Sequence, residues 1–200
     1  MSSALTWQAA APKCYAAAMA FRWWGVALVL VAAGCTRTHG TVELMAPFSD
    51  DTVVGELTVT WRDAGEWRLA HGPDTPERRV LFRIDAVNRL SDGLYLRLRD
   101  FRLLARGEVI DTAATAECTL APGTTAGVIS GALWVPASLA QRIGGFQIDR
   151  FAVPLSERGR AFYREFLLLQ RPGAALAIDT ELAAYAAAPP CKSTQWPPGL

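Results

Sequence analysis

The stretch VLFRIDAVN at residues 80–88, followed by LYLRLRDFRLL at residues 94–104, decides the fold class. In both stretches every second residue is apolar over most of the length, which is the periodicity of a strand with one buried face. The segment between them, 88–93, contains Asn, Ser, Asp and Gly, residues that favour tight turns. The two stretches therefore predict a pair of consecutive antiparallel strands.

Further short alternating runs lie on both sides of this pair. They cover residues 42–46, 54–61, 67–70, 108–110, 114–120, 126–135 and 146–153. Many short strands separated by turn residues predict an all-β fold, an immunoglobulin-like antiparallel β-sandwich. We expect one or two short helices, at 136–143 and 180–188, after a cleaved signal helix. The segment 156–170 fits either a helix or a turn followed by a strand.

The region 80–155 is similar to small telokin-like bacterial lipoprotein domains. The similarity depends on a strand that ends near Asn88, a polar turn, and a second strand that holds Phe101 and a Leu pair at 103–104. It implies an immunoglobulin-like fold. It implies no known activity and assigns no catalytic residue.

The first 34 residues contain no acidic side chain, and Arg22 precedes an apolar run that ends in AAGC at residues 32–35. A basic start, a short apolar run and small residues before a cleavage point are typical of a signal peptide. The AAGC sequence resembles the lipobox of bacterial lipoproteins, which implies cleavage before Cys35 and diacylation of its thiol. An uncleaved membrane anchor, or a plain signal peptide with a chance cysteine, remains the alternative.

These observations predict four segments. They are a signal peptide at 1–34, with Met19 as the alternative start, a lipidated tether at 35–40, a sandwich domain at 41–175 and an Ala/Pro-rich tail at 176–200. Thr follows the cysteine, which resembles lipoproteins sorted to the outer membrane. We therefore expect a location in the cell envelope, lipid-anchored at the periplasmic face of the outer membrane.

Four cysteines are present, and two of them, Cys14 and Cys35, belong to the leader and the expected lipid site. Cys118 and Cys191 remain as an even pair in an exported, oxidising setting, where disulfides form and persist. We expect a bond between these two. Two unpaired thiols are the alternative.

Composition and motifs exclude several classes of function. The formal net charge is +1, so no electrostatic binding to nucleic acid is expected. No nucleophile elbow, phosphate loop or dinucleotide-binding glycine pattern occurs. The two histidines, His39 and His71, lie in the expected tether and in a loop, without zinc-like spacing to cysteines. We expect no catalytic residue, no metal and no cofactor.

One set of residues suggests a binding face. Arg97, Arg99 and Arg102 follow one strand. Trp61, Trp67 and Trp134 are core candidates that would form a flat platform if exposed together, and Trp61 and Trp134 are assigned to the binding face with the arginines. The arginines would bind an anionic headgroup or glycan, or else pair with nearby carboxylates. The sequence thus favours a non-catalytic, lipid-anchored module. It would contact the membrane through Cys35, and it would bind another envelope protein. A ligand-binding lipoprotein and a carboxylate-based hydrolase are the alternatives.

Overall fold

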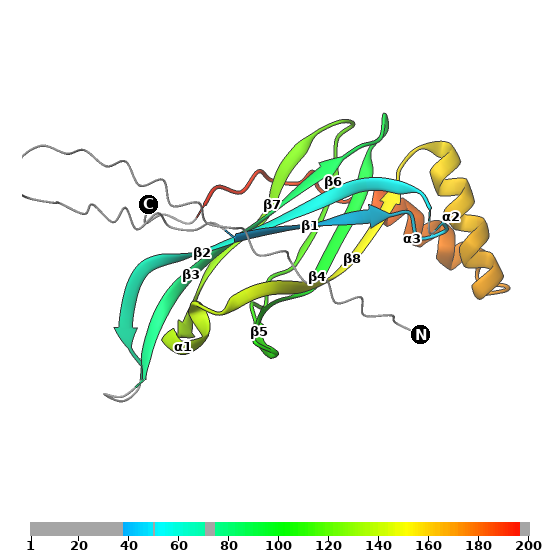
Figure 1. The fold of residues 1–200 in the computed structure, drawn as a ribbon. Coiled ribbons are helices and arrows are strands. Elements are labelled where there is room, and N and C mark those ends of the chain that lie inside the picture. The colour runs from blue at the N-terminus through cyan, green and yellow to red at the C-terminus, as the bar shows by residue number, and fades with distance from the viewer. Residues whose placement is uncertain (1–37, 50, 71–74, 197–200) are drawn as a thin grey trace, which may run out of the picture.

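The computed structural model describes residues 38–49, 51–70 and 75–196. They form two antiparallel sheets packed face to face, with two longer helices at one end (Figure 1). The first sheet has the order β1-β2-β3-β7. Its strands are β1 (Thr38–Met45), β2 (Val53–Leu69), β3 (Pro76–Asn88) and β7 (Thr125–Pro136). The expected all-β antiparallel sandwich is confirmed.

The second sheet is built around β4 (Leu94–Ala105). One edge of β4 pairs with β8 (Ile143–Pro154), and the other edge pairs with β5 (Glu108–Asp111) and β6 (Ala116–Leu120). The alternation that decided the fold class places every second side chain of β3 and β4 in the space between the sheets. The largest core side chains include Leu44, Leu57, Trp61, Phe82, Ile84, Leu96, Phe101 and Leu103.

Three helices occur in the described part of the chain, where one or two were expected. They are α1 (Ala137–Ala140), α2 (Glu157–Gln170) and α3 (Ala175–Ala186). The segment 156–170, which the sequence left open, is helical. The Ser156 hydroxyl accepts a hydrogen bond from the Gly159 amide at the start of α2, and Tyr163 and Leu167, one turn apart, are buried on one face. The expected signal helix lies outside the described residues.

The disulfide between Cys118 and Cys191 is present. It joins β6 to the segment that follows α3. Backbone hydrogen bonds from Thr119 N to Pro189 O and from Cys191 N to Thr119 O, both 2.8 Å, flank the bond. The segment assigned to a tail therefore contains a packed helix and a covalent link to the sandwich.

The strand β1 begins earlier than the sequence indicated. Thr38, His39 and Gly40 pair with residues 59–61 of β2, although all three belong to the expected tether. The expected lipid site at Cys35 therefore lies three residues before the first described strand residue. Residues 35–37 lie outside the described part of the chain.

The β2–β3 hairpin is longer than the rest of the sandwich. Residues 67–70, expected as a separate strand, continue β2 after an irregularity in the register between Asp63 and Trp67. We call residues 63–69 and 76–79 the arm. Figure 1 shows the arm extending beyond β4, at the end of the molecule opposite to α2 and α3. Its core-facing side therefore has no second sheet opposite it.

Candidate functional site: the outer face of the second sheet

The three arginines of β4 lie on one face of the second sheet. Arg97 and Arg99 alternate with buried leucines, whereas Arg102 has the opposite parity. A register shift lies between Arg99 and Arg102, and Asp100 within it has a φ of 48°. This irregularity reverses the alternation, so that Phe101 is buried and Arg102 points to the outer face. The structure thus brings the three predicted arginines together.

Each arginine lies directly across from a carboxylate on a neighbouring strand. In the strand register Arg97 lies opposite Glu117 of β6, Arg99 opposite Asp149 of β8, and Arg102 opposite Asp111 of β5. Directly opposed charges of opposite sign stabilise a sheet.

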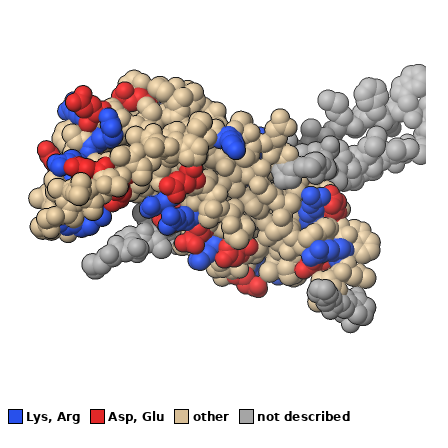
Figure 2. Space-filling view, turned by 180° about the vertical axis from the view of Figure 1, so that it is seen from behind, with Lys and Arg blue, Asp and Glu red and all other residues tan. Residues whose placement is uncertain are grey.

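None of these three pairs reaches the 4.0 Å of a salt bridge within the described residues. The charges on this face nevertheless cancel, because there is one acidic group for each arginine. Figure 2 shows basic and acidic side chains intermixed on the face that it presents. This arrangement favours the solvated, charge-compensated interpretation over an anion-binding surface.

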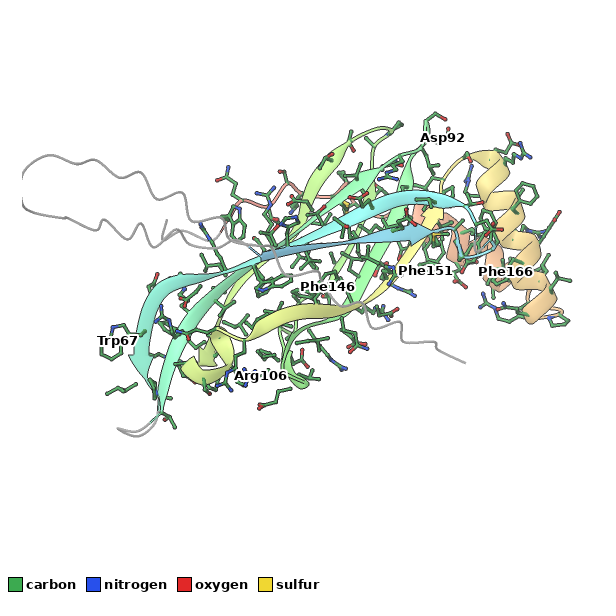
Figure 3. The ribbon with its side chains drawn as sticks, viewed as in Figure 1. Trp67, Asp92, Arg106, Phe146, Phe151 and Phe166 are labelled. Atoms are coloured by element: carbon green, nitrogen blue, oxygen red, sulfur yellow. A yellow bond between two sulfur atoms is a disulfide. The ribbon has the colours of Figure 1, made fainter. Side chains whose placement is uncertain are left out.

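One end of this face is covered by α2 and α3. Arg97 lies over the Phe151 ring at 4.8 Å from its centroid, at the border of the covered region. The second hydrophobic cluster beneath the helices consists of Tyr95, Val153, Tyr163, Leu167, Ile178, Leu182 and Tyr185. The Tyr95 and Tyr185 rings stack at 4.3 Å. Figure 3 shows Phe151 between the sheet and the helical end. The helices thus bury much of the aromatic part of the face.

Three tyrosine hydroxyls lie in this cluster and have shifted acidities. Burial raises the pKa of Tyr95 to about 12, and its 2.7 Å hydrogen bond to Glu117 adds to the shift. Burial also raises the pKa of Tyr163 and of Tyr185. The Tyr185 hydroxyl donates in addition to the Glu181 carboxylate. In all three cases the neutral phenol is the form that fits the packed cluster.

These shifts predict the alkaline behaviour of the protein. The three tyrosines of the cluster are the only ones in the sequence after Tyr15. A phenol whose pKa is raised by folding contributes stability below its unfolded value of 10.0, and loses this contribution as the pH rises through the folded value. We expect stability to fall from about pH 10 upward, and no tyrosinate absorbance near pH 10 while the fold persists.

The measurement is an ultraviolet pH titration of the chain without residues 1–34, followed in parallel by circular dichroism. The control is the chain in guanidinium chloride, in which all three phenols should ionise near the ordinary value. A tyrosine that ionises near pH 10 with an unchanged dichroism spectrum would contradict the packing of the cluster.

The two tryptophans assigned to the face do not belong to it. Trp61 is 3% exposed in the core between the sheets, where its indole N–H donates to Ile143 O at 3.4 Å. It therefore cannot form part of a surface platform. Trp134 is half-buried on the outer side of the first sheet, beneath the Arg68 guanidinium at 4.5 Å. The expected platform of tryptophans and arginines is not formed.

Exposed apolar side chains occur instead at the two ends of the molecule. Trp67, expected in the core, is 68% exposed on the arm, and Leu69 on the same strand is 56% exposed. At the helical end Leu169 and Leu176 are 84% and 83% exposed. Figure 3 places Trp67 and Phe166 at opposite ends. Alternation in the sequence marks such residues as core candidates, because it does not show where the opposing layer ends.

The described residues also show how the polar groups that could serve catalysis or metal binding are placed. The buried polar side chains there are Arg62 and Asn88, so each described carboxylate retains contact with solvent. No group of three or more His, Cys, Asp or Glu side chains is close enough to hold a metal ion in the described part. His39 is exposed on β1, and His71 lies outside the described residues.

Comparisons with protein-family models, with curated proteins and with solved structures found no significant match to this chain. Among the described helices, none combines the length and the hydropathy that crossing a membrane requires.

Proposed function

We propose that the chain is a non-catalytic lipoprotein of the cell envelope, anchored through Cys35, that acts as an accessory or interaction module for another envelope protein. The observation that supports this proposal most directly is the position of the AAGC sequence. Its cysteine lies three residues before the strand that opens the folded domain. A lipid on Cys35 would therefore hold the domain directly at a membrane, facing the periplasm if the lipoprotein is sorted to the outer membrane.

The disulfide supports an exported location. Cys118 and Cys191 are joined across a separation of 73 residues. Stable structural disulfides form in oxidising compartments and are rare in the cytosol. A folded domain that begins at Thr38 and is closed by such a bond agrees with export and attachment through a leader.

The helical end supports an interaction role. Leu169 at the end of α2 and Leu176 at the start of α3 flank the turn between the two helices, and Phe162 on α2 is 45% exposed. Exposed apolar side chains gathered in one region are typical of a protein interface. This end lies opposite the arm, and β1 runs toward it from Thr38, the first described residue (Figure 1). We propose it as the face that meets the partner.

The anchor is tested by changing Cys35→Ala. We expect the wild-type chain to begin at Cys35, to carry diacylglycerol with or without a third acyl chain, and to fractionate with membranes. Two or more acyl chains give stable anchoring. The variant should lose both the lipid mass and the membrane fraction. Intact mass spectrometry of the detergent-extracted protein is the measurement. A wild-type chain without lipid, or one that retains residues before Cys35, would contradict the proposal.

The partner face is tested with a photo-crosslinking amino acid placed in the cell at Leu169 or at Leu176. We expect a discrete adduct with one envelope protein from these positions. Val109 on β5, which is 56% exposed, serves as the control position and should give none. Equal adduct yields from all three positions, or none from the helical positions, would count against this face.

A further inference from the structure

One side of the arm, which we call the apolar side, carries the exposed Trp67 and Leu69 next to Arg78 and Pro76, their partners on β3. Trp67 and Leu69 are two residues apart in a continuous register with Arg78 and Pro76 of β3, so their side chains share one side of the hairpin. On the other side, Arg68 forms an ion pair with Glu77 at 2.7 Å. The apolar side is the continuation of the core-facing side of the first sheet beyond the second sheet. It exposes two large apolar residues without a covering layer.

The charges of the arm are compensated within it. Arg78 pairs with Asp63 at 2.7 Å and Arg79 with Glu66 at 2.9 Å, in addition to the Arg68 pair. All six charged residues of the two arm segments are thus in ion pairs. The described residues of the arm therefore carry no net charge and have little net attraction to anionic lipid.

The arm lies at the end of the molecule from which the proposed anchor leaves. Thr38 pairs with Trp61, and β1 runs from there away from the arm. Three residues of chain span at most about 10 Å, so a lipidated Cys35 stays near this end. From Trp61, β2 continues directly into the arm. The apolar side of the arm and a lipid on Cys35 would therefore lie toward the same end of the domain.

We propose that Trp67 and Leu69 insert into the interfacial layer of the bilayer that holds the lipid on Cys35. The domain then has a second contact with the membrane and a fixed orientation on it. This inference rests on the proposed anchor. Tryptophan is enriched at membrane–water interfaces, because its ring is apolar and its indole N–H finds polar partners there. Two apolar side chains alone hold a protein at a membrane only weakly. The lipid on Cys35 would keep them at the membrane surface.

The test uses the lipidated full-length protein in vesicles of phosphatidylethanolamine with a minority of phosphatidylglycerol. One variant carries Leu69→Cys and a matched control carries Leu176→Cys at the helical end. In the processed protein the new cysteine is the single free thiol, since Cys14 is removed with residues 1–34, Cys35 is acylated and Cys118 is bonded to Cys191. An environment-sensitive fluorophore is attached there. Intact mass spectrometry of the same samples reports the acylation.

In acylated samples we expect the label at position 69 to shift to shorter wavelength and to be quenched severalfold more by a quencher on shallow lipid carbons than the label at 176. Because the arm charges are paired, the shift should not depend on the phosphatidylglycerol content. Acylated protein with equal exposure at both positions would overturn the arm contact and leave the anchor intact. A shift at 69 without lipid-borne quenching would indicate self-association and overturn the contact too. Unacylated protein would overturn the proposed function and this inference together.

Discussion

Removing the disulfide by changing Cys118→Ala and Cys191→Ala together should lower the free energy of unfolding by about 4 kcal/mol. The bond closes a loop with a sequence separation of 73 residues. Without it, the unfolded chain regains the conformational freedom that the loop had removed. The helices that cover the Tyr95 cluster would then be held to the sandwich by packing and by the short pairing near Thr119 alone.

The measurement is urea-induced unfolding of the oxidised wild type and of the double variant, followed by circular dichroism. Wild type treated with a reducing agent is the matched control, and it should unfold at the midpoint of the double variant. An unchanged midpoint in both would mean that the C-terminal segment contributes little to the constraint on the unfolded chain. A fall in the variant alone would point to the alanine substitutions rather than to the bond.

Changing Asn88→Ala should lower the free energy of unfolding by about 3 kcal/mol. Asn88 is 1% exposed at the end of β3. Its side-chain N–H groups donate to Asp92 O at 2.8 Å and to Ala121 O at 3.0 Å, and its side-chain oxygen accepts from Leu90 N at 3.0 Å. The alanine variant leaves these backbone groups without their partner in a place that is closed to water.

Thermal and urea unfolding of the variant check this value. Asp92→Ala is the control, because it alters an exposed side chain in the same turn, keeps the backbone oxygen that Asn88 meets, and should change stability by less than about 0.5 kcal/mol. Asn88→Asp adds a second criterion. A carboxylate cannot donate to the two carbonyls. The loss in free energy of unfolding should therefore be larger at neutral pH than at a pH low enough to protonate the carboxylate that replaces the amide. Equal stability of Asn88→Ala and Asp92→Ala would refute the role of Asn88.

Much of the sandwich was predictable because one face of each strand is buried. The stretches at 80–88 and 94–104 became β3 and β4, and the segment 88–93 became the turn between them. The disulfide followed from counting the cysteines that remain once those of the expected leader and lipid site are set aside. The role of Asn88 was not predictable, since it is a turn residue by type, and the carbonyls of residues 120–121 that it binds are distant in sequence.

The candidate surfaces were only partly predictable. The three arginines of β4 do share a face, but Arg102 does so because the strand is irregular near Asp100, which no period of two reveals. The carboxylates opposite them come from three other strands. Trp61 and Trp67 both stand in alternating runs, yet one is in the core and the other is exposed. The difference depends on how far the second sheet extends.

The immunoglobulin-like relationship and the lipid anchor stay predictions from the sequence. The first depends on the pattern of 80–155, and the second on the AAGC sequence at 32–35, outside the described residues. The mass measurement on Cys35→Ala decides the second of these.

The place of β1 has a mechanical consequence. β1 is the edge strand of the first sheet, is paired with β2 from Thr38 to Met45, and starts at the arm end. A pull toward the membrane through the residues before Thr38 acts along the axis of this strand. All inter-strand hydrogen bonds of the pair then bear the load at the same time, in shear, instead of opening one after another. A lipid on Cys35 would thus tether the domain through a strand whose direction resists being peeled from its sheet.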